Sequence, residues 1–356
     1  MARVAEDHVM SELLDWSLAL VPVLLMAALF VWLDIFKLMS VWEMLGLLIL
    51  GGIAALAAWP ISGQMLDALP MGFSFYSRMV APWIEEALKG IAVVLLFAGN
   101  RIGYKMDAVI SGFAIGAGFS VIENIFYLSR YPELTAPVWM VRGLGTAIMH
   151  GTTTAILAAT VHELGERATR RSGAKFWLNP LWFIPGYVAA SLIHMLFNHF
   201  PDQPMQVMFA TLVVAPRVLL GVLRFGEGEA HGWLAEESAA HEAALGEWRG
   251  GGFPKDASGQ RIAALARRSA GTQAERIHAY CTLKTELVLA AERELQDKDR
   301  EVEPEERYRL RRQFAELEAL RKAMGRTGFA ALKPLLPFSR NDEWELAELR
   351  EVVGRD

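Results

Sequence analysis

Seven long apolar runs constrain this chain more than any other feature of its sequence. An α-helix needs about 20 residues to cross a bilayer, where only structures that bond their own backbone groups are tolerated. The sequence therefore predicts an all-α fold, a polytopic transmembrane helix bundle of about seven spans. The runs lie near residues 16–33, 41–60, 79–98, 108–128, 137–161, 180–199 and 205–223.

The charged residues are distributed unevenly along the chain. Residues 1–224 hold 15 acidic and 14 basic side chains, whereas residues 225–356 hold 25 and 21. We therefore expect a membrane domain at 1–224 and a charged, helical cytosolic domain at 225–356. Apolar residues recur every three or four positions in the second part, which is typical of packed amphipathic helices. No basic block indicates nucleic-acid binding, and a cytosolic regulator is the expected partner of this region.

The loops between the runs predict an orientation. The loops after the third and fifth runs are basic, so the positive-inside rule predicts a multi-pass cell-membrane protein with its N-terminus outside and its C-terminus in the cytoplasm. No small-residue cleavage site precedes Asp34, which favours an uncleaved first span over a signal peptide. The single Cys281 permits no intrachain disulfide and fits a reducing compartment. The basic loop residues are Arg101, Lys105, Arg167, Arg170, Arg171 and Lys175.

Polar side chains interrupt four of the runs at a similar depth. At 1.5 Å per helical residue they fall in the outer half of the bilayer in the predicted orientation. A charged side chain inside a span costs about 2.5–3.5 kcal/mol on insertion scales, so such residues indicate a functional site. Packing alone would explain one of them, but it explains the whole set poorly. The set is Glu85, Glu86, Glu123, His150, His194 and Asn198, with Lys89 as a supporting residue.

Spacing predicts which of these residues meet. Glu85 and Lys89 are four residues apart on one helix face, so we expect Lys89 to lower the cost of an ionised Glu85. His194 and Asn198 have the same spacing and should point together into the bundle.

Three other patterns in the runs have simpler interpretations. The glycines within 112–118 predict close helix packing. The threonines at 152–154 can bond back to helix carbonyls and pack between helices. His162 and Glu163 look like the start of an HExxH zinc motif, but Glu166 stands where the second histidine is required.

The residue types of this layer permit hydrolysis of a peptide bond without a serine or cysteine nucleophile. A glutamate in a low-dielectric pocket can take a proton from water, and a His–Asn pair can donate to the developing oxyanion. The same residue types can bind zinc, which lowers the pKa of a bound water. We favour no cofactor over Zn because the carboxylates already supply a base. The candidate metal ligands are Glu85, Glu86, Glu123, His150 and His194.

Two other classes of function fit the same layer. An ion- or proton-coupled membrane transporter would use the buried glutamates and histidines as a pathway. A receptor without catalytic activity would signal through its cytosolic part.

Three short motifs follow one another along successive runs: EEALK at 85–89, FSVIE at 119–123 and HMLFN at 194–198. In this order they resemble the PrsW family of intramembrane proteases, in the superfamily of CAAX prenyl endopeptidases and bacteriocin-processing enzymes. The resemblance covers roughly 79–200, and His150 falls where such proteins often carry a further histidine.

The resemblance implies an intramembrane endopeptidase in which a glutamate activates the attacking water. Its substrate would be a single-span membrane protein cut near the extracytoplasmic surface, as in site-1 cleavage of an anti-sigma factor. The CAAX enzymes carry FxxxH where this chain has FxxxE, so a prenylated substrate is not implied.

Overall fold

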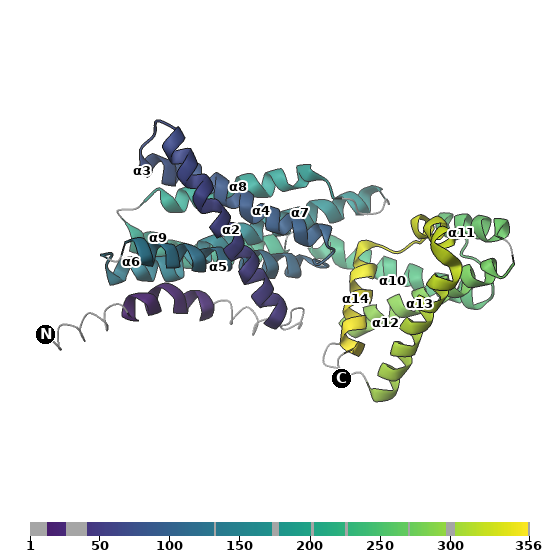
Figure 1. Ribbon diagram of the computed structural model, residues 1–356. Helices are drawn as coiled ribbons and strands as arrows, with labels where there is room; N and C mark the ends of the chain where they lie inside the picture. Colours follow the sequence, from purple (N-terminus) through teal and green to yellow (C-terminus); the bar gives the residue numbers. More distant parts are fainter. Residues whose placement is uncertain are drawn as a thin grey trace. The chain divides into compact units, whose positions relative to one another are not determined.

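The computed structural model of the chain is built from helices (Figure 1). The described residues are 89% helical and include no strand, which confirms the all-α prediction. The chain divides into two compact units, Met1–Gly226 and Glu227–Asp356, and each is considered by itself below. The structure describes residues 13–25, 41–131, 133–172, 178–200, 203–224, 227–269, 271–296 and 303–354.

The first unit is a bundle of apolar helices. Five of the described helices are long and apolar enough to cross a membrane. Figure 1 shows α2 crossing the other helices of this unit obliquely. The elements are the helix Leu13–Leu25, α2 (Val41–Ala68), α3 (Phe73–Phe75), the π-helical turn η1 (Tyr76–Val80), α4 (Ala81–Ala98), α5 (Lys105–Arg130), α6 (Ala136–Met140), the π-helical turn η2 (Val141–Thr146), α7 (Ala147–Ser172), the 3₁₀ turn η3 (Pro180–Trp182), α8 (Phe183–Asn198) and α9 (Pro204–Arg224).

Two of the seven predicted spans are not among these five helices. The span predicted at 79–98 corresponds to α4, an apolar helix that is not counted among the five because it carries three charged residues. The span predicted at 16–33 is described only over the apolar helix Leu13–Leu25, and the rest of it lies outside the described residues. The number seven is therefore approximate.

Helices α5 and α7 form the centre of the bundle. The most apolar windows of α5 and of the α6–η2–α7 segment are 72% and 89% buried, against 22% for α8 and 11% for α9. A Cβ at Gly116 of α5 would collide with the backbone carbonyl of His150 in α7, and one at Gly118 with that of Leu48 in α2. The predicted close packing at these glycines is confirmed, and it fixes where His150 lies.

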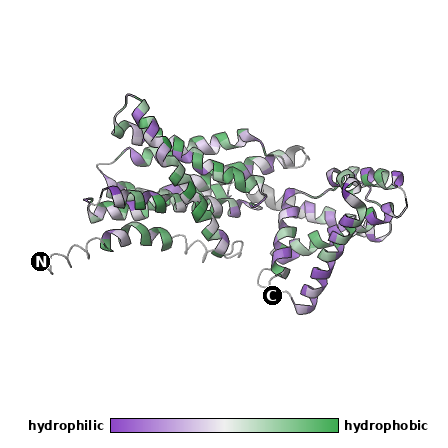
Figure 2. Cartoon of the chain, viewed as in Figure 1, coloured by the Kyte–Doolittle hydropathy of each residue, from purple (hydrophilic) through white to green (hydrophobic). Residues whose placement is uncertain are grey.

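The second unit is a helical bundle with its own core. Buried side chains such as Ile277, Leu287 and Leu310 form one apolar cluster. Figure 2 shows many hydrophilic residues along these helices, whereas the helices of the first unit are mostly hydrophobic. The elements are α10 (Glu227–Arg249), α11 (Ala257–Arg268), α12 (Gln273–Gln296), α13 (Pro304–Leu332), the 3₁₀ turn η4 (Lys333–Leu335) and α14 (Arg340–Gly354).

Candidate functional site

Four helices of the first unit bring the predicted polar residues together. Helix α4 contributes two glutamates and a lysine, α5 and α7 contribute Glu123 and His150, and α8 contributes His194. Helices α4 and α7 both follow a π-helical turn, a distortion that occurs often at functional sites. The side chains form one connected network, which the following paragraphs trace from its centre outward.

Glu86 lies at the centre of this network and is completely buried. Its Oε1 atom accepts hydrogen bonds from Lys89 Nζ at 2.5 Å and from Thr153 Oγ1 at 3.1 Å. The same oxygen lies 2.9 Å from His194 Nδ1. Lys89 thus bonds directly to Glu86, the glutamate one position after Glu85 on the same helix face.

His150 joins Lys89 to Glu123. Its Nδ1 lies 2.9 Å from Lys89 Nζ and its Nε2 lies 3.0 Å from Glu123 Oε2. An ammonium group has no acceptor, so Nδ1 accepts from Lys89, and Nε2–H donates to the carboxylate. The ring also contacts Phe119 and the ring of His194, with centroids 5.0 Å and 4.7 Å away.

His194 has one ring nitrogen, Nε2, that is not bonded to Glu86, and this nitrogen faces Glu85. Because the Glu86 carboxylate only accepts, His194 donates Nδ1–H to it, and Nε2 keeps a lone pair in the neutral ring. That nitrogen lies 3.7 Å from Glu85 Oε2, beyond hydrogen-bond distance. Glu85 Oε2 is buried and has no hydrogen-bond partner among the described residues. The side chain of Glu85 is nevertheless 16% exposed, whereas that of Glu86 is inaccessible.

Arg142 and Thr153 belong to this network although the sequence analysis did not assign them to it. Arg142 Nη2 lies 3.1 Å from Glu123 Oε1, and its guanidinium is 3.5 Å from the centre of the Tyr127 ring. Thr153 follows His150 by three residues, so it lies on the same face of α7. This spacing was a usable signal for Thr153, whereas the ion pair of Arg142 is a non-local contact between η2 and α5.

Two asparagines complete the π-helical turns. Asn198 donates to the carbonyl of Ser77 in η1 at 3.0 Å, and Asn124 donates to the carbonyl of Arg142 in η2 at 3.1 Å. A π-helical turn disrupts the usual helix hydrogen bonds, so a side-chain donor can satisfy its carbonyl. The Asn198 amide, which was expected to act together with His194, thus bonds to the backbone of η1.

Glu85, His150 and His194 could also hold a metal ion. Their ligand atoms all lie within 4.8 Å of one another. Two imidazoles and a carboxylate are a common ligand set for catalytic zinc, and ligating histidines usually bond a carboxylate through their other nitrogen. His194 has this arrangement with Glu86, and Glu85 Oε2 offers an oxygen that is otherwise unsatisfied. His150 bonds to Glu123 through Nε2 in the same way, but its Nδ1 accepts from Lys89, so the three residues fit a divalent ion only once Lys89 releases that nitrogen.

His162 and Glu163 of the incomplete HExxH pattern make contacts that hold two helices together. His162 Nε2 lies 2.9 Å from the carbonyl of Gly103, and Glu163 forms ion pairs with Lys105 and Arg167. These contacts hold the C-terminal half of α7 against the start of α5. They involve none of the network residues described above.

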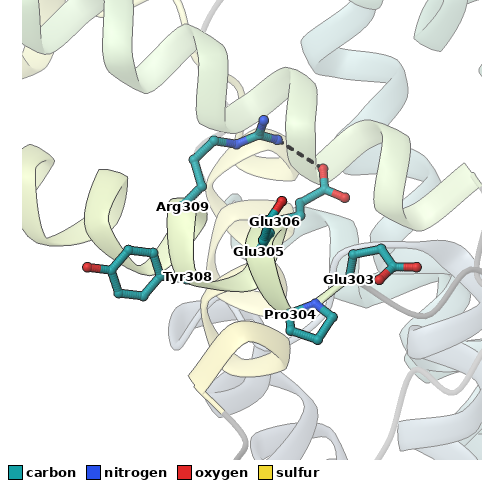
Figure 3. Close-up of a pocket in the computed structure, with 6 residues that line it drawn as sticks. All are labelled: Glu303, Pro304, Glu305, Glu306, Tyr308 and Arg309. Carbon is teal, nitrogen blue, oxygen red and sulfur yellow. Dashed lines mark hydrogen bonds and ion pairs between the residues drawn. The ribbon is translucent and has the colours of Figure 1, made fainter.

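The second unit contains a hollow at the start of α13 (Figure 3). It is open and lined by charged residues, with an ion pair of 3.1 Å between Arg309 and Glu306. None of the motif residues lines it, so it adds nothing to the chemistry of the network. Its lining residues are Glu303, Pro304, Glu305, Glu306, Tyr308 and Arg309.

One protein-family model matches the part of the chain that contains this network. A family model described as "PrsW family intramembrane metalloprotease" matches residues 38–222. The match includes all of the network residues. No curated protein and no solved structure matches the chain.

Proposed function

The chain belongs to the PrsW family of intramembrane metalloproteases, and we propose that Glu85 is the group that activates water in its active site. The observation that carries this assignment is the difference between the two adjacent glutamates. Both glutamates have an Oε2 without a hydrogen-bond partner among the described residues, but Glu86 is inaccessible and accepts three donors on its Oε1, whereas the side chain of Glu85 is 16% exposed. Glu86 is thus suited to orient its neighbours, and Glu85 to act on a water.

The proposed reaction is general-base hydrolysis of a peptide bond. Glu85 takes one proton from water while the oxygen forms a bond to the carbonyl carbon, and the carbonyl electron pair moves onto its oxygen. When the intermediate collapses, the C–N bond breaks and the leaving nitrogen takes the proton back from Glu85. The products are a carboxylic acid and an amine, which at neutral pH become a carboxylate and an ammonium group. Glu86 holds His194, and Lys89 with Glu123 holds His150, so both imidazoles keep a fixed orientation beside the water.

A metal site built from the same residues is the alternative arrangement, in which Glu85 is a ligand and not the base. Glu85, His150 and His194 would hold the ion, with Glu86 orienting His194. A bound divalent ion such as zinc would polarise the carbonyl and lower the pKa of a water toward neutrality. Elemental analysis of the purified protein, together with activity in a strong chelator, distinguishes this arrangement from catalysis by the carboxylates alone.

We propose a single-span membrane protein as the substrate, cut near its extracytoplasmic edge. The family match supports intramembrane proteolysis, and the loop charges support a site in the outer half of the bilayer. A peptide bond inside a helix is shielded, so a substrate with Pro or Gly near the cut should be preferred. An anti-sigma factor is one candidate of this kind.

The test replaces Glu85 by Gln in the full-length protein reconstituted in proteoliposomes. A quenched fluorescent single-span peptide, chosen from a library by wild-type cleavage, serves as the probe. We expect Glu85→Gln to lower kcat by at least about 100-fold, because general acid–base catalysis contributes that much or more. Glu133→Gln, at an exposed position, is the matched control. Hydrolysis by Glu85→Gln within threefold of the wild type would exclude Glu85 as the base.

A further inference from the structure

The proposed hydrolysis develops negative charge on the substrate's carbonyl oxygen, and an active site normally provides donors for that oxygen. Most polar groups of the network already have partners within the chain. His194 donates Nδ1–H to Glu86, and Asn198 donates to the carbonyl of Ser77. Lys89 is completely buried and bonds to Glu86 and His150. None of these three has a partly exposed cationic donor to offer a substrate.

The side chain of Arg142 is 15% exposed and carries N–H groups that the chain leaves unbonded. Its Nη2 forms the ion pair with Glu123, but both Nε and Nη2 are buried without a hydrogen-bond acceptor among the described residues. A guanidinium presents its N–H groups in a fixed plane, and stacking on the Tyr127 ring fixes that plane here. Leaving a buried N–H of a charged group without an acceptor is unfavourable, so this edge is suited to an acceptor that the chain does not supply.

Arg142 also lies at the accessible part of the network. The side chains of Arg142, Glu123 and Glu85 are 15%, 22% and 16% exposed, whereas the four members between them are nearly inaccessible. Ligand atoms of Glu85 and His150 lie within 4.8 Å of one another, His150 bonds to Glu123 at 3.0 Å, and Glu123 pairs with Arg142 at 3.1 Å, so the three accessible side chains are close in space. A substrate carbonyl that meets a water on Glu85 is therefore within the field of the guanidinium.

We propose that Arg142 is a catalytic residue that donates an N–H to the substrate's carbonyl oxygen as this becomes an oxyanion. The inference rests on the proposed function of Glu85. In the step concerned, the water oxygen bonds to the carbonyl carbon, its proton passes to Glu85, and the displaced electron pair resides on the oxygen that Arg142 contacts. The pair returns when the C–N bond breaks. The ion pair with Glu123 remains throughout and holds the guanidinium in place.

The first test replaces Arg142 by Gln and by Lys in the proteoliposome assay with the single-span peptide. We expect Arg142→Gln to lower kcat by about 100-fold or more, the usual cost of losing one oxyanion donor, with KM changed less than threefold. Arg142→Lys should fall between that variant and the wild type because it keeps the charge but loses the planar fork. Arg130→Gln, at the exposed end of α5, is the control. A kcat for Arg142→Gln within threefold of the wild type would overturn the proposal.

A second test separates catalysis from mere positioning of Glu123. A phosphinic analogue of the peptide carries a tetrahedral anionic group, and its binding is measurable even where hydrolysis is too slow. If Arg142 contacts the oxyanion, Arg142→Gln weakens analogue binding about tenfold or more, both in the wild type and in Glu123→Gln, and leaves the affinity of the unreacted peptide unchanged. No further weakening in the Glu123→Gln background would show that Arg142 acts only through Glu123. An active Glu85→Gln variant would instead refute the proposed function itself.

Discussion

Glu86 and Lys89 form an ion pair without solvent access, and such a pair is much more costly to break than to replace. Glu86→Gln leaves the Lys89 ammonium buried without its carboxylate, so we expect the unfolding free energy to fall by about 3–5 kcal/mol. Denaturant unfolding of the protein in detergent micelles measures this loss. Glu133→Gln removes an exposed carboxylate and should change stability by less than about 0.5 kcal/mol.

The double variant Glu86→Leu/Lys89→Met extends this prediction. Two apolar side chains of similar volume need no counter-charge, so stability should return to near the wild-type value or above it. Activity should not return, because His194 then lacks the carboxylate that fixes its Nδ1–H. A stable double variant with wild-type activity would show that Glu86 has no orienting role.

For individual residues, the sequence predicted the members of the network better than it predicted their contacts. The acidic and imidazole residues were recognisable because each is costly inside an apolar run. The partner of Lys89 was not recognisable, because residues three and four positions before it both lie on the same face of the helix. The choice is made by His150 and Thr153, which approach Glu86 and Lys89 from α7 and are 60 or more positions away in the sequence.

Among the helices, the contact of α5 with α7 determines where the histidine of α7 lies. Gly116→Ala would push a methyl group into the His150 backbone, so we expect a loss of about 1–3 kcal/mol in stability and at least tenfold in activity. Gly46→Ala in α2 is the matched control, because a Cβ there meets no atom within 4 Å. Thermal unfolding and peptide hydrolysis of both variants test this. If Gly116→Ala and Gly46→Ala had equal stability and equal activity, the contact between α5 and α7 would not be what positions His150.

The π-helical turns are the feature of the helices that the apolar runs did not predict. Hydropathy reports the length of a span but not a local change in its hydrogen bonding. Each turn lies just before a helix that carries network residues, and each receives a side-chain amide, from Asn198 or from Asn124. The HMLFN motif therefore contains one residue of the network and one that supports the helix before Glu85.

For the molecule as a whole, the second unit has a pH-sensitive contact between three of its helices. Burial disfavours the charged imidazole of His241, but the hydrogen bond that His241 donates to Glu292 and the charge of Asp342 outweigh it and raise the pKa of His241. Burial also raises the pKa of Asp342. Both groups bind protons more tightly in the folded state. The stabilisation from His241 is complete below the unfolded pKa of His, about 6.5, and is lost as pH rises through its raised folded pKa. That from Asp342 is complete only below the unfolded pKa of Asp, about 3.9, and is lost as pH rises through its own folded pKa.

We therefore expect α10, α12 and α14 of the full-length protein to exchange amide hydrogens more readily as pH rises from about 6 to 8, after correction for intrinsic rates. His241→Gln should flatten this dependence, whereas substitution of the exposed His278 should leave it in place. Protection that increases with pH in the wild type would contradict the assignment.

The orientation of the whole molecule decides which surface the site faces, and engineered cysteines can test it. The native Cys281 is buried and its pKa is raised to about 12, so it should not react with a maleimide in the folded protein. Asp67 and Gln203 are exposed residues beside the loops that follow α2 and α8. Glu85 lies in the first half of α4 and His194 in the last half of α8, near the ends of these helices that face those loops. In intact cells, Asp67→Cys and Gln203→Cys should react with an impermeant maleimide, and Gln260→Cys in α11 should react only after permeabilisation. The reverse labelling would place the glutamates nearer the cytoplasmic surface, and a cut at the extracytoplasmic edge of the substrate would then be excluded.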